Sequence, residues 1–235
     1  MAGLPWVTSA RNSPGEAVNR AEQMVLRYEA GYTYMQETLL NLRRELSFFH
    51  DPLEQSYWMA RAEFLLGGLT RSIGDRRGAD ALFQRSLHFA EEALARREFS
   101  DGFRILADSL GQLLTLRGIL FQLSNGLRAR DAAIMALELD WSNLRAHVSV
   151  GAYYLNAPEV AGGDVEYATT ILANVIADRR SNQIERFLAY GFLALGYDEL
   201  DDRRRAHESY REAAQIFPRN PWLTSVADEI EAPPS

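Results

Sequence analysis

Apolar residues recur at spacings of three and four along most of the chain, in segments separated by Pro, Gly, Asn and Asp. This spacing places them on one side of an α-helix, and runs of β-branched residues, which are typical of strands, are few. The pattern therefore predicts an all-α protein.

Two of the expected helices begin with recognisable capping signals. Ser13 is followed by a proline and, three residues on, by Glu16, which is the pattern of a capping box. Asp51 and Pro52 repeat the combination of a capping side chain and a proline, so a further helix is expected to begin there.

Four segments repeat a common arrangement of small and aromatic residues. In the first, Gly67 and Ala79 are twelve residues apart, and an aromatic residue follows four positions later. In the last, Ala194 and Ala206 have the same spacing, and an aromatic residue again follows four positions later. Small residues permit two helix backbones to approach closely, so the repeated unit is expected to be a pair of packed helices.

These residues resemble the tetratricopeptide repeat family, whose unit is two antiparallel helices over 34 residues. The resemblance implies a right-handed superhelix of antiparallel helix pairs, an α-solenoid, with unit starts near residues 60, 110, 144 and 187. Only one interval between consecutive unit starts, from 110 to 144, equals the 34 residues of the family's repeat. The expected organisation is a disordered tail over 1–12, N-terminal capping helices over 13–59, four helix pairs over 60–230 and a disordered tail over 231–235.

The third unit is expected to carry an inserted loop between its helices. Its small residues, Gly151 and Ala168, are 17 residues apart where the family has 12. The extra residues fall around Asn156, Ala157, Pro158 and Glu159, and this loop is a candidate contact for a partner.

The same stretch resembles, over a single repeat, the T component that accompanies some TRAP-type solute transporters. The resemblance implies a periplasmic, lipid-anchored protein that oligomerises, works beside a solute-binding protein and holds an apolar cavity. The residues that carry it are Tyr153-Tyr154, Ala157-Pro158, Gly162-Gly163-Asp164 and Ala168.

Composition narrows the classes of partner. The 32 acidic residues outnumber the 25 basic residues, all of them Arg, so the net charge is −7 and nucleic acid is not an expected partner. No run of about 18 apolar residues occurs, so insertion into a membrane is not expected. The sequence as given is expected to be cytoplasmic, or periplasmic if a signal or lipidation segment precedes it.

Catalytic and metal-binding arrangements are not apparent. The absence of cysteine excludes thiolate metal sites and a cysteine nucleophile. The four histidines, His50, His88, His147 and His207, are isolated from one another and from carboxylates at the spacing of metal ligands. We therefore expect no enzyme activity, no metal and no cofactor.

The resemblance also implies a concave face, lined by positions 2, 5, 9 and 12 of the first helix of each unit. In this chain the face is mostly apolar or small. The N-terminal helices either cover it, so that its residues are ordinary core, or leave it open as a binding groove. The candidate binding residues there are Phe64, Gly68, Leu114, Gly118, Phe121, Val148, Ala152, Leu155 and Leu195.

The leading hypothesis is a non-enzymatic helical-repeat scaffold or adaptor that binds a protein or peptide partner through the apolar concave groove. The alternative is a carrier of an apolar small molecule, or a transport accessory of the T-component type, with the ligand in a cavity floored by Gly68, Gly118 and Ala152. Assembly into a homo-oligomer is left open by the sequence.

Overall fold

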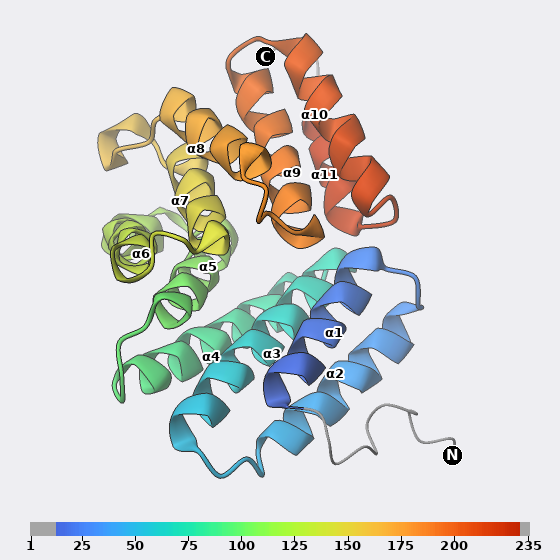
Figure 1. The fold of residues 1–235 in the computed structure, drawn as a ribbon, viewed down its shortest axis with the longest axis vertical. Helices are drawn as coiled ribbons and strands as arrows, with labels where there is room; N and C mark the ends of the chain where they lie inside the picture. Colours follow the sequence, from blue (N-terminus) through green and yellow to red (C-terminus); the bar gives the residue numbers. More distant parts are fainter. Residues whose placement is uncertain (1–12, 231–235) are drawn as a thin grey trace.

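The computed structural model describes residues 13–230, which contain eleven α-helices, one short 3-10 helix and no strand. The predicted tails at 1–12 and 231–235 lie outside the described residues. The all-α prediction is confirmed (Figure 1). In chain order the elements are α1 (Pro14–Arg27), α2 (Tyr32–Leu46), α3 (Pro52–Ser72), α4 (Arg76–Leu94), α5 (Ser100–Leu116), α6 (Ile119–Leu139), α7 (Leu144–Asn156), η1 (Glu159–Ala161), α8 (Val165–Ala177), α9 (Gln183–Glu199), α10 (Arg203–Ile216) and α11 (Pro221–Ile230).

Consecutive helices pack as antiparallel pairs that stack one after another. Figure 1 shows the stack running from α1–α4 in one half of the molecule, through α5 and α6, to α7–α11 in the other half. Each pair packs on the next, as α4 does on α5 and α8 on α9, and the last helix, α11, packs on both α9 and α10. The described residues therefore form the predicted α-solenoid.

Local capping side chains explain where several helices begin. Ser13 Oγ accepts a hydrogen bond from the backbone N–H of Glu16 at 3.3 Å, as the sequence predicted. Asp51 Oδ1 accepts from the first free N–H groups of α3 at 2.9 and 3.0 Å. Asn182 and Glu185 form a complete capping box at α9, which satisfies N–H groups that have no partner within the helix.

The helix boundaries differ from the expected starts of the repeat units. Only α7 begins at an expected start, residue 144, whereas residues 60, 110 and 187 lie inside α3, α5 and α9. Small residues mark where two helices cross, but caps and turns decide where a helix begins. The predicted starts were placed relative to the small residues. They therefore missed the first turns of α3, α5 and α9.

Glycine allows two of the pairs to pack closely. A Cβ atom at Gly67 of α3 would lie 2.7 Å from Cε1 of Phe83 in α4. A Cβ atom at Gly151 of α7 would lie 2.7 Å from Cγ of Leu172 in α8. Both distances are shorter than a van der Waals contact, so these positions favour glycine because the neighbouring helix occupies the space.

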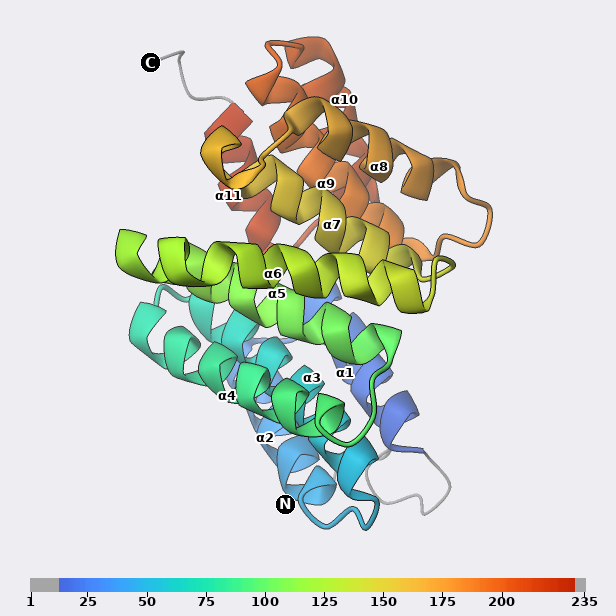
Figure 2. The ribbon, with the colours of Figure 1, turned by 90° about the vertical axis from the view of Figure 1, so that its left-hand side faces the viewer.

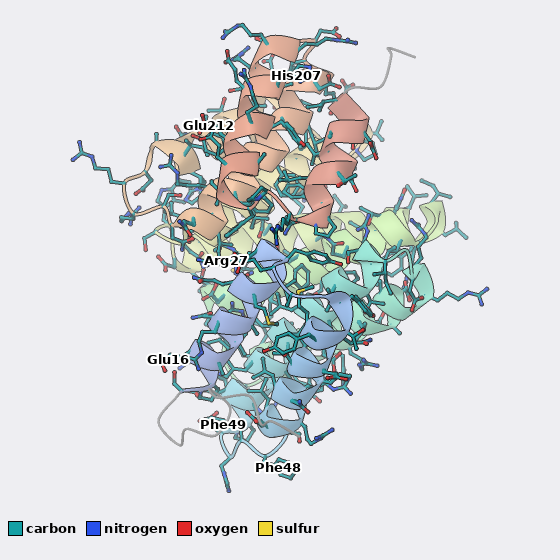
Figure 3. All side chains as sticks on the ribbon, turned by 90° about the vertical axis from the view of Figure 1, so that its right-hand side faces the viewer. Glu16, Arg27, Phe48, Phe49, His207 and Glu212 are labelled. Atoms are coloured by element: carbon teal, nitrogen blue, oxygen red, sulfur yellow. The ribbon has the colours of Figure 1, made fainter. Side chains whose placement is uncertain are left out.

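The first described helix also contacts the last part of the fold. Asn220, in the turn before α11, donates a hydrogen bond from Nδ2 to the backbone oxygen of Leu26 at 2.8 Å. The Leu26 side chain packs against the cluster that contains Phe187 and Phe217. Figure 3 shows the C-terminal end of α1, marked by Arg27, beside the last helices. The C-terminal end of α1 thus contacts the turn before the last described helix.

Candidate interaction surfaces

The helix α1 lies against the first helices of the following pairs, where the sequence predicted a concave groove. The carboxylate of Glu22 accepts hydrogen bonds from Arg61 of α3 at 2.6 Å and from Arg145 of α7 at 2.9 Å. All three side chains are largely buried. The described structure therefore places α1 over this part of the inner face rather than leaving it open.

The arginines around Glu22 hold its carboxylate in the charged form. Burial alone would raise the pKa of Glu22, but the charges of Arg145, Arg61 and Arg104, with the hydrogen bond from Arg145, outweigh it. Together they lower the pKa from an ordinary 4.5 to about 2. Glu22 thus stays ionised at neutral pH and fastens α1 to two other helices.

A second ion cluster lies on α5 beside the first. The buried guanidinium of Arg104 donates to Asp101 at 2.9 Å and to Asp108 at 2.8 Å, and Ser149 of α7 also donates to Asp108. Burial would lower the pKa of Arg104, but the two carboxylates outweigh it and raise that pKa. Every charge in this cluster thus has a partner, so the cluster itself offers no uncompensated charge to a ligand.

The nine residues predicted for the groove pack on several different clusters, although Leu155 and Leu195 line one small hollow together. Phe64 and Leu114 are half-buried and pack against the large core cluster of α3–α7. Val148 belongs to a different cluster between α7, α8 and α9, and Leu195 packs against a third one beside α11. Of the remaining members, Leu155 is buried, Ala152 is half-buried and Gly68 is exposed with open space around it.

Two of the predicted groove residues lie on a different helix from the one expected. The sequence placed Gly118 and Phe121 on the first helix of the second unit. In the structure α5 ends at Leu116, Arg117 is extended, and Gly118 is the N-cap of α6, on which Phe121 lies. The prediction was wrong here because Arg117 and Gly118 alone form the turn between α5 and α6, and no proline marks it.

The inserted loop lies between α7 and α8, at the predicted place. It contains the 3-10 turn η1, and Gly162 follows with a φ of +85°, a conformation that favours glycine. The Tyr153 hydroxyl donates to the backbone oxygen of Ala161 at 2.8 Å and holds the turn against α7. Val160 at its tip is 98% exposed.

Among residues 13–230, the largest group of exposed apolar side chains lies at the start of α6, and the sequence pattern did not single it out. We call these four residues the α6 stripe: Ile119 (61% exposed), Leu120 (81%), Leu123 (73%) and Leu127 (53%). In α6, burial begins only at Ala129. Figure 2 shows α6 lying across the face that looks toward the viewer.

The exposure of the stripe follows from the lengths of neighbouring helices. The helix α6 has 21 residues, whereas α7, which packs against it, has 13. At a rise of 1.5 Å per residue, the difference leaves about 12 Å of α6 without cover from α7. The sequence carried no signal of this exposure, since the four stripe residues lie on one side of the helix with the spacing of a buried face.

A hollow of about 410 Å³ opens on the other side of α6, between α4, α5 and α6. Its lining is mainly apolar and includes Leu94, Phe103 and Met135. An ion pair between Glu91 and Arg128 lies at its border.

Residues 13–230 offer neither a metal-binding cluster nor a membrane span. Within this range no group of three or more His, Asp or Glu side chains is arranged to hold a metal ion. None of the helices there is both long and apolar enough to cross a membrane.

Comparison with known proteins identifies the architecture. No family model matches the sequence, and no curated protein matches it significantly. Among solved structures, TTC0263, a thermophilic TPR protein of Thermus thermophilus, superposes with a TM-score of 0.59. The alignment covers 94% of this chain and 100% of that one, with 15% sequence identity. The described chain has the fold of a tetratricopeptide repeat protein.

A second similar structure is YrrB, described as a TPR protein with an unusual peptide-binding site. Its alignment covers 92% of each chain at 17% identity, with a TM-score of 0.39. That score is too low to transfer the position of a site. At these identities, the similarity to TTC0263 establishes the TPR fold and nothing about the partner.

Proposed function

We propose that the chain is a helical-repeat scaffold that binds a protein or peptide partner and has no catalytic role of its own. The observation that carries the proposal is the α6 stripe. Contiguous exposed apolar side chains are typical of interaction sites, because a monomer gains nothing from leaving them in water. The TPR fold supports the proposal by providing a rigid array of helices on which such a surface is displayed.

The α6 stripe suits this role better than the predicted concave groove. A partner in the groove would have to displace α1 and separate Glu22 from Arg61 and Arg145. The stripe needs no such rearrangement. Groove binding stays a prediction from the sequence, and in this structure it competes with α1.

The inserted loop extends the same face. Arg130, three residues after Leu127, reaches to within 4.0 Å of the position that a Cβ atom would take at Gly162 in this loop. The exposed Val160 at the tip of the loop therefore lies on the side of the molecule where the stripe ends. A partner that covers the stripe could extend onto the loop.

The exposed side chains provide enough energy for a specific contact. Burying a fully exposed Leu or Ile contributes about 1.5–3 kcal/mol. With 53–81% of each of the four stripe side chains exposed, the stripe offers roughly 4–8 kcal/mol before the costs of association. This range suits a reversible contact supplemented by polar interactions at its edge.

The test is quantitative capture of partners from the source organism, followed by direct binding of any partner that is identified. We expect Leu120→Asp/Leu123→Asp to lose the partner while helicity and thermal stability stay unchanged, because both side chains are exposed. Trp141→Asp, which changes an exposed aromatic residue beyond the far end of α6, is the matched control and should retain the partner. Unchanged capture by the stripe variant would contradict the proposal.

The carrier of an apolar small molecule stays a prediction from the sequence. Gly68, Gly118 and Ala152, the residues expected at the floor of its cavity, do not line the hollow between α4, α5 and α6. Native mass spectrometry of the purified protein tests it directly, since a carried ligand would add mass that denaturation removes.

A further inference from the structure

Two arginines, Arg71 and Arg76, lie beside the turn that leads into α6, and the exposed Arg77 follows Arg76 in the first turn of α4. We call these three residues the arginine cluster. Arg71 Nη1 donates to Oε1 of Gln112 in α5 at 2.6 Å. Arg76 Nη2 lies 3.4 Å from the backbone oxygen of Leu116, three residues before the α6 stripe begins. The turn between α3 and α4, which carries the cluster, therefore lies against the turn that leads into the stripe.

The arginine cluster has no ion-pair partner among the described residues. The nearest carboxylates along α4 have other partners. Asp75 accepts from the backbone N–H of Gly78 at 2.8 Å and caps α4, and Asp80 forms two hydrogen bonds with Arg117 at 2.7 and 2.9 Å. Three arginines and the single carboxylate of Asp75 thus leave a net positive charge near one end of the apolar stripe, in a chain whose net charge is −7.

The cluster is also a place where added negative charge would be favourable. Partial burial lowers the pKa of Arg71, and the neighbouring charge of Arg76 lowers it further. The two like charges repel each other, and a carboxylate from a partner would relieve that repulsion. Arginine suits this role because its planar donors match the geometry of a carboxylate.

The dimensions of the stripe match one short helix. From Ile119 to Leu127 it is about 12 Å long, which corresponds to just over two turns. A partner helix presents apolar residues at positions i, i+3 or i+4, and i+7 over the same length.

A second copy of the chain fits the stripe less well. A fully exposed aliphatic side chain offers roughly 100 Å², so the four stripe residues bury at most roughly 400 Å² on each side. Stable interfaces bury about 800 Å² per partner.

We propose that the α6 stripe and the arginine cluster together bind one amphipathic helix of a partner protein, in which two or more Asp or Glu residues lie just beyond one end of the apolar face. The apolar face covers the stripe, and the carboxylates pair with the arginines. This inference rests on the proposed function, because it takes the stripe as the docking surface.

Synthetic helical peptides test the inference on the full chain. The probe is an 18-residue helical peptide whose apolar face consists of leucines at i, i+3, i+4 and i+7. Three glutamates lie just beyond one end of this face. Two versions are made, one with the glutamates N-terminal to the leucines and one with the glutamates C-terminal to them. The matched peptides carry glutamine or lysine in place of glutamate. Binding is measured by fluorescence anisotropy at low and moderate salt.

We expect the glutamate peptide, in one of its two orientations, to bind at least ten-fold more tightly than the glutamine peptide, with the advantage shrinking as salt rises. Arg76→Glu/Arg77→Glu should reverse the preference, so that the lysine peptide binds best. Arg203→Glu/Arg204→Glu, which makes the same change of charge at exposed positions on α10, should leave the preference unchanged. No binding of the glutamate peptide, or reversal by the α10 variant as well, would overturn the inference.

Two further results separate this inference from the proposed function. If glutamate and glutamine peptides bind equally and both are lost in Leu120→Asp/Leu123→Asp, the acidic partner is wrong and the stripe remains the docking surface. If Leu120→Asp/Leu123→Asp binds all of the peptides as tightly as the parent protein does, both the acidic partner helix and the stripe as docking surface are wrong. A dimer in sedimentation equilibrium that the stripe variant converts to monomer would overturn the inference in favour of a second copy.

Discussion

Replacing Glu22 by glutamine tests whether α1 is held in place by charge. The change keeps the shape of the side chain but removes the negative charge between Arg61 and Arg145. The difference between a pKa of about 2 in the folded state and an ordinary 4.5 corresponds to about 3 kcal/mol of stabilisation. We therefore expect Glu22→Gln to lower the free energy of unfolding by about 3 kcal/mol at pH 7.

The dependence on pH identifies the cause. Because the pKa of Glu22 is lower in the folded state than in the unfolded state, its stabilisation is complete above about pH 5 and is lost as the pH falls toward 2. The parent protein should therefore lose this contribution between pH 5 and pH 2, whereas Glu22→Gln has no such contribution to lose. By pH 2 the two proteins should agree to within about 1 kcal/mol.

Urea unfolding followed by circular dichroism at pH 7, 5, 3 and 2 measures the difference. Repeat proteins do not always unfold in one step, so hydrogen exchange of the α1 amides provides a local readout of the same opening. Glu16→Gln, an exposed change on the same helix, is the matched control and should cost less than about 1 kcal/mol (Figure 3). A full-sized loss at pH 2, or none at pH 7, would refute the electrostatic explanation.

Four further substitutions test the packing and the capping of the helices. Gly67→Ala should destabilise the protein by about 1–3 kcal/mol in thermal or urea unfolding, because the new Cβ atom would press on the buried ring of Phe83. Gly68→Ala, on the same helix, should stabilise it by about 0.5–1 kcal/mol, because its Cβ atom would lie in open space. Asn220→Ala removes the hydrogen bond to Leu26 and a cap of α11, so we expect a loss of about 1–2 kcal/mol and faster hydrogen exchange at the end of α1. Gly118→Asp supplies a side-chain cap that α6 lacks and should raise the free energy of unfolding by a few tenths of a kcal/mol; a lowered value would contradict the assigned N-cap.

The features that the sequence predicted correctly depend on short stretches of chain. Ser13 and Asp51 cap helices because each bonds to N–H groups two or three residues away. Gly67 and Gly151 lie at helix crossings because a repeated spacing of small residues reflects the contact between adjacent helices. Such signals need no knowledge of the rest of the fold.

The features that the sequence did not predict depend on distant parts of the chain. Glu22 meets partners that are 39 and 123 residues away, so nothing near α1 indicates that it covers the inner face. The α6 stripe has the same apolar spacing as a core helix, and its exposure follows from the shortness of α7. An apolar pattern indicates that a face could be buried, but the neighbouring helices decide whether it is.

The hydrogen bond between Asn220 and Leu26 constrains how this chain can vary. In an open solenoid each repeat touches only its neighbours, so units can be gained or lost at either end with little effect on the others. Here the two ends meet across 194 residues of sequence, and the rotation accumulated over all the pairs determines whether they do. Inserting or deleting one pair would change that rotation and separate the ends. The contact between Leu26 and Asn220 therefore depends on the number of helix pairs that lie between them.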